Sequence, residues 1–254
     1  MKKNLNGKII IVTGCEGLLG KEFTKYLCEQ NAIVVGIDKK KSNFKNELFY
    51  FIQCDITSKT SVKNCLKKIK KNIGNPYGLL HCAAYNPKIN VKEDNSIENY
   101  SLDKLDKSFK VNVHGTLLVC QIFGSYMAKN KKGSIIILNS IYGLVSPKHK
   151  IYETKEKKYF KPIDYSITKS ALINLTRYLS TYWGKENLRV NSISLGGIYD
   201  NQNKSFIKKY SNNVPLGRLA NKNEFNGAIY YLLSDESSYI TGSNIVIDGG
   251  WTAW

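Results

Sequence analysis

Short apolar runs alternate with amphipathic segments along almost the whole chain. The apolar runs, several of them rich in β-branched residues, read "KIIIVT", "AIVVGID", "LFYFIQCD", "YGLLHCAA", "GSIIILNS", "LRVNSISL" and "SNIVIDGG". Runs of this kind are typical of strands buried on both faces of a parallel sheet. The amphipathic segments, whose apolar residues recur with helical spacing, are 19–30, 59–71, 102–130, 164–184 and 221–233.

The regular succession of strand and helix predicts an α/β fold, a doubly wound parallel sheet of about seven strands with helices on both faces. With 254 residues the chain is long enough for one large domain. No linker, internal repeat or low-complexity segment interrupts the pattern. We therefore expect a single domain over residues 1–254.

No apolar run approaches the roughly 18 residues that a membrane-spanning helix needs. The first residues lead directly into a predicted strand rather than into a signal-peptide core. We therefore expect a protein of the cytoplasm with no membrane partner. The six cysteines show neither C-x-x-C nor Cys/His ligand spacing, so we expect buried free thiols and no metal site.

The formal net charge of +18 raises nucleic acid as a partner. However, the basic residues are almost all lysines spread along the chain, and arginine occurs only at 177, 189 and 218. Arginine is the residue that reads phosphates and bases through paired hydrogen bonds. We therefore prefer solvated lysines as the explanation of the charge and expect no nucleic-acid partner. A binding curve titrated with salt would reveal nucleic-acid binding if it occurred.

A glycine-rich turn follows the first predicted strand. In "TGCEGLLG", Gly14, Gly17 and Gly20 stand between that strand and the start of the first helix. Residues without Cβ let backbone N–H groups and a helix N-terminus approach a pyrophosphate closely. Glycine turns also serve plain chain reversal, so these three residues alone are weak evidence.

An acidic residue at the end of the second predicted strand strengthens this evidence. Asp38 stands 24 residues after Gly14, where a carboxylate can accept hydrogen bonds from the adenosine ribose hydroxyls and repel a 2′-phosphate. Together the two features predict a Rossmann-type site for NAD. The lysines at 39–41 keep NADP as an alternative cofactor, and a helix cap or a solvated loop acid is the alternative role of Asp38.

A second group of candidate residues lies in the other half of the chain. "YSITK" places Tyr165 and Lys169 four residues apart at the start of a predicted helix, and "ILNS" ends a predicted strand at Ser140. The spacing of four puts the phenol and the ammonium on one helical face. Because a nearby cation favours a phenolate, the pair can act as an acid/base at neutral pH.

These features, in this order, resemble the short-chain dehydrogenases/reductases in their compact single-domain branch. The resemblance covers essentially the whole chain and rests on "TGCEGLLG", "CDIT", "HCAA", "VNVHG", "LNS", "YSITK", "LRVNSISLGG" and "SSYITGSNIVIDGG". It implies an NAD(P)-dependent oxidoreductase that interconverts a hydroxyl and a ketone.

The resemblance implies a catalytic tetrad of Asn112, Ser140, Tyr165 and Lys169. In this scheme Tyr165 moves the hydroxyl proton and Ser140 holds and polarises the carbonyl oxygen. Lys169 lowers the pKa of Tyr165 and grips the nicotinamide ribose, while Asn112 anchors a water-linked proton relay to Lys169.

The resemblance also implies a cofactor site. Asp55 matches the family acid that faces the adenine, and residues 196–198 fall where the nicotinamide carboxamide is lined. The implied cofactor-binding residues are Gly14, Glu16, Gly17, Leu18, Leu19, Asp38, Asp55, Ile56, Ala83, Tyr165, Lys169, Gly196, Gly197 and Ile198.

Three positions depart from the family pattern. The glycine spacing G-x-x-G-x-x-G is more usual in a longer branch of the family. His81 replaces a structural Asn, and we expect a packed or hydrogen-bonded scaffold residue there rather than a catalyst. Leu195 stands where the family has Pro, which alters the expected shape of the nicotinamide pocket.

The segment "NLRVNSISLGGIYDNQ" and the ending "DGGWTAW" resemble the flagellin-modification A proteins, which are linked to the biosynthesis of legionaminic acid and related nonulosonic sugars. This resemblance implies a sugar or sugar phosphate substrate. Two alternatives stay open. One is a catalytically altered nucleotide-binding regulatory module, which the retained tetrad disfavours; the other is epimerase or dehydratase chemistry on the same fold.

The family resemblance implies a homodimer or homotetramer. Such assemblies form through the two long helices and the C-terminal strand, and the apolar face of 171–179 suits either that contact or the core. We expect Trp251 and Trp254 to pack, within the domain or at a subunit interface.

The segment between Ser140 and Tyr165 spans 25 positions, about twice the length that the family resemblance implies. We expect an active-site insertion at about 143–163, over the crevice where ligands of such folds bind. It is rich in lysine, which predicts either solvated side chains or a cationic lid that attracts an anionic substrate. The candidate substrate residues are Tyr142, Lys148, Lys150, Lys157 and Lys158.

Overall fold

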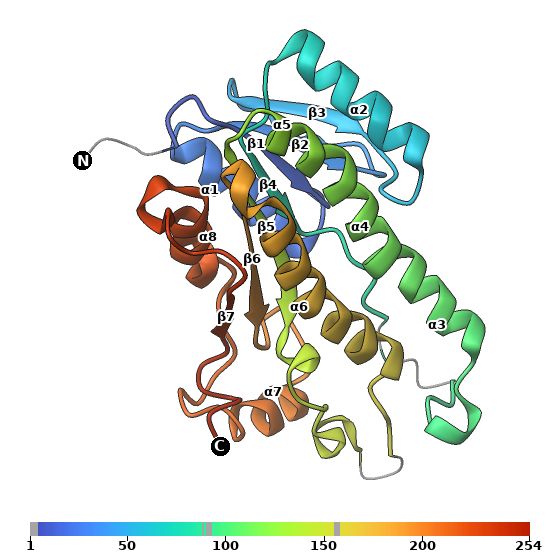
Figure 1. Ribbon diagram of the computed structural model, residues 1–254. Helices are drawn as coiled ribbons and strands as arrows, with labels where there is room; N and C mark the ends of the chain where they lie inside the picture. Colours follow the sequence, from blue (N-terminus) through green and yellow to red (C-terminus); the bar gives the residue numbers. More distant parts are fainter. Residues whose placement is uncertain (1–4, 88, 90–92, 155–157) are drawn as a thin grey trace.

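A computed structural model of the chain describes residues 5–87, 89, 93–154 and 158–254 (Figure 1). Within these ranges one sheet holds seven strands in the order β3-β2-β1-β4-β5-β6-β7, and each neighbouring pair is parallel. The strands are β1 (Ile9–Thr13), β2 (Ile33–Asp38), β3 (Phe49–Gln53), β4 (Gly78–His81), β5 (Gly133–Ser140), β6 (Leu188–Leu195) and β7 (Asn244–Ile247). The predicted doubly wound α/β sheet is confirmed.

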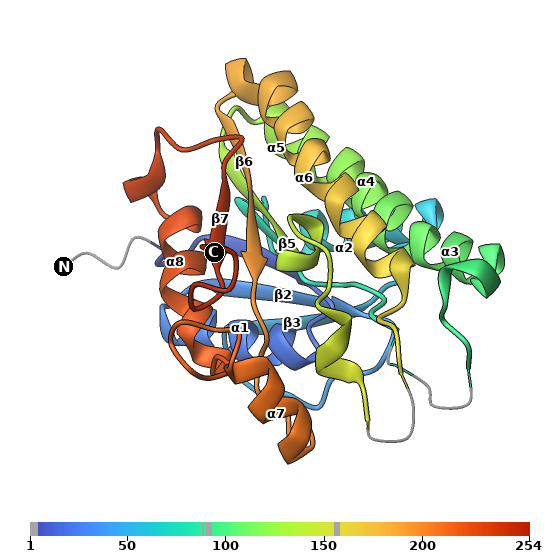
Figure 2. The same ribbon diagram turned by 90° about the horizontal axis from the view of Figure 1, so that it is seen from below.

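Helices cover both faces of this sheet, as Figures 1 and 2 show from two directions. They are α1 (Leu18–Glu29), α2 (Lys59–Asn72), α3 (Leu102–Phe109), α4 (Thr116–Val119), α5 (Ser125–Lys129), α6 (Ile163–Trp183), α7 (Lys204–Ser211) and α8 (Asn226–Leu233). On one face α2, α4, α5 and α6 pack their apolar side chains against the strands, and on the other face α1 and α8 do so.

The predicted helix over 102–130 is one continuous helical rod that contains two π-helical segments. Lys110–Gly115 joins α3 to α4, and Cys120–Gly124 joins α4 to α5. Single π-helical turns widen a helix locally and occur often at functional sites. The first of these segments carries Asn112, whose surroundings are described below.

Alternate residues of the central strands face opposite apolar clusters. In β1, Ile9 and Ile11 pack on the face covered by α2, whereas Ile10 and Val12 pack on the face covered by α1 and α8. Because both sets of side chains are buried, both must be apolar, and the strand reads as an unbroken apolar run.

The two edge strands differ from the expectation of burial on both faces. No residue of β3 or β7 is fully buried, and Tyr50 and Val246 are exposed. Each of these strands has a single neighbouring strand in the described sheet, so fewer elements cover it. An apolar run in the sequence does not distinguish an edge strand from a central one.

A third apolar cluster lies beyond the carboxyl ends of β5 and β6. Its buried members are Ile141, Tyr142, Ile151, Tyr210, Val214, Leu219 and Trp251. It joins the segment after β5 to α7 and to the C-terminal residues. These three parts lie together at the lower end of the molecule in Figure 1. Helix α7 is too short to show a clear period in the sequence, and it was not predicted.

The two C-terminal tryptophans have different environments. Trp251 is buried and stacks on Tyr210 with ring centroids 4.4 Å apart, which confirms the expected packing. Trp254 is 74 % exposed, so it does not pack within the domain, and the other expected place, a subunit interface, stays a prediction. An aromatic residue at a chain end has few neighbours unless another element is folded over it.

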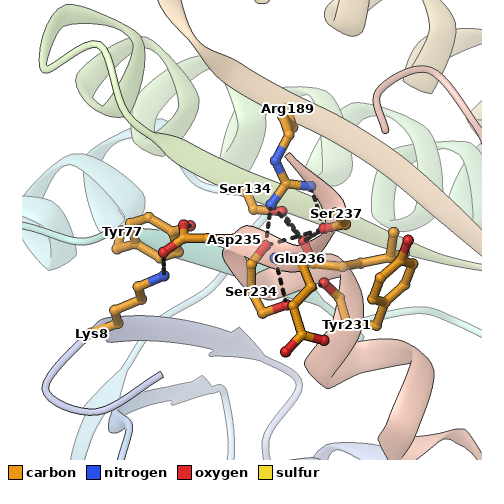
Figure 3. Close-up of polar contacts among 10 residues, drawn as sticks. Lys8, Tyr77, Ser134, Arg189, Tyr231, Ser234, Asp235, Glu236 and Ser237 are labelled. Atoms are coloured by element: carbon orange, nitrogen blue, oxygen red, sulfur yellow. Dashed lines mark hydrogen bonds and ion pairs between the residues drawn. The ribbon is translucent and has the colours of Figure 1, made fainter. Parts of the chain in front are cut away.

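A buried arginine near the start of β6 ties this strand to the turn after α8 (Figure 3). The Arg189 guanidinium donates to the Ser237 hydroxyl at 2.8 Å and to the carbonyls of Leu232, Ser234 and Ile240 at 2.9, 3.0 and 3.4 Å. Planar guanidinium groups are suited to such a fan of acceptors. The arginine therefore closes the turn that follows α8.

We expect Arg189→Met to lower the free energy of unfolding by roughly 2 kcal/mol, because the hydrogen bonds that the buried, charged guanidinium donates are lost. The carbonyls themselves keep their hydroxyl and amide donors. Arg177→Met, at an exposed position of α6, serves as the control and should change it by less than about 0.5 kcal/mol. Urea denaturation of the three proteins measures the difference. Equal midpoints for Arg189→Met and the wild type would show that the network carries no net stability.

Candidate active site

The candidate residues gather at the carboxyl edge of the sheet, beside the point where the strand order reverses. β1 pairs with β2 on one side and with β4 on the other, so the connections leaving β1 and β4 run in opposite directions. Ligands of open α/β sheets bind in the crevice that such a reversal creates.

The glycine turn after β1 brings its backbone close to the end of β4. Gly14 has a φ of +65°, and a Cβ on it would lie 2.8 Å from the Cα and N of Ala83. The Gly17 amide donates to the Gly14 carbonyl at 2.9 Å, and α1 begins at the next residue. Side chains are excluded there, so the turn leaves a cradle of backbone in front of the helix N-terminus.

Asp38 lies beside this cradle at the end of β2. Its carboxylate accepts hydrogen bonds from the backbone amides of Glu16 at 3.1 Å and Lys40 at 3.0 Å. These two bonds fix the carboxylate against the glycine turn and leave lone pairs for further donors. An acceptor held there suits the hydroxyls of a ribose.

Asp55 follows β3 and lies next to the same edge. Its carboxylate accepts from the Thr57 amide and hydroxyl, both at 2.8 Å, and pairs with the Lys39 ammonium at 3.1 Å. Partial burial raises the pKa of this carboxyl, but the hydrogen bonds from Thr57 and the charge of Lys39 outweigh it, and the net pKa lies below the usual value. Lys39 therefore faces Asp55, and its pairing weakens the positive charge that the sequence placed beside Asp38.

Ser140 and Tyr165 meet at the end of β5 and in the first turn of α6. Burial raises the pKa of the Tyr165 phenol above its usual value, and a hydrogen bond with Ser140 offsets part of that rise. The Ser140 hydroxyl also accepts from the Tyr142 amide at 3.2 Å, which orients it. The structure thus brings together the serine and the tyrosine that the sequence placed in separate elements.

Lys169 lies one turn along α6 from Tyr165 and is almost fully buried. Its ammonium donates to the Leu138 carbonyl at 2.8 Å and lies 5.8 Å from the centroid of the Tyr165 ring. Burial lowers the pKa of Lys169 to about 8. The Tyr165 hydroxyl hydrogen-bonds to Ser140, whereas the Lys169 ammonium lies nearer to the face of the Tyr165 ring and donates to the strand.

Asn112 lies in the π-helical segment between α3 and α4 and is buried. Its side-chain amide donates to the Tyr85 carbonyl at 2.9 Å and to the Thr168 hydroxyl at 3.1 Å, and its oxygen accepts from the Tyr85 amide. These bonds connect the chain after β4 to α6, one residue before Lys169. Asn112 therefore ties the segment after β4 to α6 beside Lys169, and its role as a relay anchor stays a prediction.

His81 bridges two threonines at the end of β4. Its Nδ1 lies 2.9 Å from the Thr13 hydroxyl and its Nε2 lies 2.9 Å from the Thr116 hydroxyl. The imidazole is buried, and burial lowers its pKa to about 3. The expectation of a hydrogen-bonded scaffold residue is confirmed.

The network around His81 requires one neutral tautomer. The Thr116 hydroxyl donates to the Asn112 carbonyl, so it accepts from His81 Nε2–H. The Thr13 hydroxyl accepts from the amides of the two residues that follow His81, so its own proton goes to Nδ1. Every polar atom of the imidazole is then satisfied without charge, and the ends of β1 and β4 are joined to the segment that carries Asn112.

Since the folded imidazole resists protonation down to about pH 3 and an unfolded histidine titrates near about 6.5, its contribution to stability is complete above about pH 6.5 and is lost as the pH falls. Between about pH 7.5 and pH 5 this amounts to roughly 2 kcal/mol. We expect His81→Asn to remove that part of the pH dependence of unfolding. His114→Asn, at an exposed histidine, should retain it, and parallel curves for the wild type and His81→Asn would contradict the assignment.

The predicted nicotinamide residues follow β6 directly. The Gly196 amide donates to the Ile247 carbonyl at 2.9 Å, the Gly197 amide donates to the Tyr210 hydroxyl, and the Ile198 carbonyl accepts from the side chain of Gln202. A side chain at 197 would collide with the Tyr210 ring. Tyr210 of α7 therefore positions this loop, a role that the sequence analysis missed because α7 was not predicted.

The segment predicted as an insertion packs on α7 and the C-terminal residues. Tyr142 is buried and its hydroxyl lies 2.8 Å from that of Tyr152. Lys148 donates to Asn213 at 2.9 Å and lies 5.4 Å from the centroid of the Trp251 ring. Of the remaining predicted substrate residues, Lys150 and Lys158 are exposed and Lys157 lies outside the described residues. The cationic lid stays a prediction.

One lysine of this segment points inward, and the sequence analysis did not select it. The Lys161 ammonium lies 4.7 Å from the centroid of the Tyr165 ring. Lys161 also lines a cavity of about 320 Å³, together with Ile97, His149, Phe160 and Ser166. Nothing in the lysine-rich segment "KEKKYFKP" separates this lysine from its neighbours, so only the fold could reveal it.

Other predictions concern the whole chain. All six cysteines are free and five are buried, as expected. Within the described ranges, no helix is both long and apolar enough to cross a membrane.

Comparisons with known proteins agree with this fold and site. A family model described as enoyl-(acyl carrier protein) reductase matches residues 19–252. The post-translational flagellin modification protein A of Campylobacter coli is 30 % identical over 97 % of this chain and 99 % of its own length. An NADH-dependent L-xylulose reductase of Ambrosiozyma monospora is 27 % identical over 98 % of this chain and 96 % of its own length.

Among solved structures, a short-chain dehydrogenase from Leptospira borgpetersenii with bound NAD+ superposes with a TM-score of 0.89. It is 30 % identical, and the match covers 99 % of this chain and 95 % of that one. The chain therefore belongs to the short-chain dehydrogenase/reductase family and is an oxidoreductase. Within that family it resembles the flagellin modification protein A.

Proposed function

We propose that this chain is an NAD-dependent oxidoreductase that interconverts a hydroxyl and a ketone on a sugar or sugar phosphate. The observation that supports the proposal best is the meeting of Ser140, Tyr165 and Lys169 at the edge of the sheet where Asp38 and the glycine turn also lie. NADP remains the alternative cofactor because lysines follow Asp38.

The residues around the glycine turn suit a dinucleotide. A Cβ at Gly14 would fill the space against Ala83, and the fixed carboxylate of Asp38 offers acceptors for ribose hydroxyls. Lys169 supplies an ammonium to the ribose on the nicotinamide side. When bound, the nicotinamide supplies hydride transfer to or from the substrate carbon.

The chain's own residues handle the proton and the substrate oxygen. Ser140 donates a hydrogen bond to that oxygen and polarises it, while Tyr165 gives a proton to it in reduction or removes one in oxidation. Lys169 and the Asn112 contacts keep α6 and the tyrosine in place. The same groups work in both directions, so the direction follows from the concentrations of the reactants.

The substrate class is supported by the names of several relatives. They include the L-xylulose reductase, a D-arabinitol 2-dehydrogenase of Candida tropicalis and a 2-dehydro-3-deoxy-D-gluconate 5-dehydrogenase of Pseudoalteromonas atlantica. All three carry out reactions on polyols, sugars or sugar acids according to those names. The resemblance to flagellin modification protein A favours a role in nonulosonic acid biosynthesis for flagellin or surface glycans.

The test is a screen of NAD and NADP reduction against hexoses, amino sugars and their phosphates, with purified protein. Turnover of a sugar or sugar phosphate supports the proposal. Tight NAD binding without turnover of any of these compounds would instead indicate the regulatory nucleotide-binding module. Faster turnover of phosphates than of free sugars would support the cationic lid.

We also propose a cytoplasmic homodimer or homotetramer. Tyr178 and Tyr182 of α6 are exposed and stack with ring centroids 6.2 Å apart, and Trp254 is exposed at the chain end. Exposed aromatic side chains are enriched at protein interfaces. Sedimentation equilibrium decides between a monomer and these oligomers.

We expect Asp38→Ala to narrow the preference for NAD over NADP, because a carboxylate near a 2′-phosphate commonly costs several kcal/mol. Isothermal titration with both cofactors measures the two affinities. Asp103→Ala, at an exposed position of α3, is the control and should leave the ratio unchanged. A wild type that prefers NADP tenfold or more would refute the role of Asp38.

Tyr165→Phe should bind NAD like the wild type but turn over substrate roughly 10²–10⁴-fold more slowly, since it removes only the ionisable oxygen. Lys169→Ala should weaken both cofactor binding and turnover, because it contributes to both. Steady-state kinetics and cofactor titration separate the two effects. Wild-type turnover in Tyr165→Phe would exclude the mechanism.

A further inference from the structure

A second lysine lies over the ring of the tyrosine that the proposed function makes the acid/base. In the part of the chain that the structure describes, two ammonium groups lie near the Tyr165 ring. Lys161 is 4.7 Å from its centroid and Lys169 is 5.8 Å from it. The nearer of the two is therefore not the lysine of the "YSITK" motif.

The Lys161 ammonium is held in place by two acceptors from another segment. It donates to the Asn86 side-chain oxygen at 2.6 Å and to the Pro87 carbonyl at 3.0 Å. Both residues follow β4, so these two bonds join the segment that precedes α6 to the segment that follows β4. Lys150 and Lys158 of the same insertion are exposed. Lys161 differs from these two lysines because its ammonium is held by hydrogen bonds to another segment.

Two opposing influences act on the pKa of Lys161, namely burial, which lowers it, and a nearby buried carboxylate, which raises it. Burial lowers its pKa to about 8, and the nearby carboxylate of Asp164 favours the charged form. Asp164 is fully buried, accepts from the Tyr165 amide at 2.7 Å and hydrogen-bonds to the Ser108 hydroxyl. At neutral pH the ammonium is therefore mostly charged, and it loses this charge as the pH rises past about 8.

Several other groups face the phenol. Ser140 hydrogen-bonds to it from β5, and Lys169 approaches from the next turn of α6. Tyr142 and Tyr152, from the segment after β5, lie close enough to interact with it electrostatically. Both of these tyrosines resist ionisation because they are buried, so they do not supply the charge that a phenolate needs.

We propose that Lys161 is a positioning residue for Tyr165, a second cation that fixes the ring and favours its ionised form. A cation over an aromatic ring is attracted to the π-electrons, and this attraction increases when the hydroxyl ionises and the ring carries negative charge. Lys161 touches neither substrate nor cofactor in this role and acts through Tyr165. The inference rests on the proposed function of Tyr165.

The pH dependence of kcat/KM for oxidation separates this role from a purely structural one. Lys161→Met should lower kcat/KM about tenfold near neutral pH, where Lys161 is charged, and by progressively less above about pH 8, where Lys161 loses its charge. The KM for NAD should not change. At high pH the wild type and the variant should converge, because Tyr165 is then ionised in both and Lys161 is neutral in the wild type.

Two further variants sharpen the test. Lys161→Arg keeps the cation and should restore most of the wild-type profile. Lys70→Met removes an ammonium that lies 4.8 Å from the centroid of the Tyr126 ring, remote from the sheet edge that holds Tyr165, and should leave the profile unchanged. A wild-type profile for Lys161→Met, or the same loss of rate at every pH, would overturn the proposal.

A wild type without turnover would contradict the proposed function, and a measurement without substrate then decides the role of Lys161. NMR of protein labelled at lysine Cε reports the loss of the Lys161 proton, and Lys161→Met identifies the signal. Because the Tyr165 ring attracts the ammonium, Lys161 should lose its proton at a lower pH in Tyr165→Leu than in the wild type. An unchanged midpoint would overturn the inference.

Discussion

The close approach of the turn after β1 to the end of β4 is the constraint on which the site depends. Gly14 has no room for a side chain against Ala83. The Thr13 hydroxyl at the end of β1 accepts hydrogen bonds from the two backbone amides that follow β4. His81 extends this contact to Thr116. β1 and β4 therefore end at a fixed separation, and this contact forms the bottom of the crevice between the segments that follow them.

The remaining site residues are positioned by contacts with neighbouring elements. The rod of α3, α4 and α5 presents Asn112 through a π-helical turn, and Asn112 in turn holds Tyr85 and Thr168. Lys169 follows Thr168, and its ammonium donates to the Leu138 carbonyl, which ties α6 to β5. Ser140 at the end of β5 then hydrogen-bonds to Tyr165 of α6, although neither belongs to the glycine turn or to its neighbours in sequence.

Burial governs the chemistry of the groups in this crevice. It raises the pKa of Tyr165 and lowers those of Lys161 and Lys169 to about 8, because each group is less stable with a charge away from water. A phenol in such a place needs nearby cations to ionise. The structure supplies one from the helix that carries the tyrosine and another from the segment that leads into it.

The sequence by itself determined the seven strands, their parallel arrangement, the glycine turn, Asp38 and the pair Tyr165 and Lys169, because these depend on local period and on spacing within one element. It did not distinguish edge strands from central ones, since both read as apolar runs. It missed α7, Tyr210 and the inward direction of Lys161. Those features depend on contacts between segments far apart in the chain, namely α7 with the loop after β6 and Lys161 with Asn86, and only the tertiary structure decides which of many similar lysines and tyrosines makes such a contact.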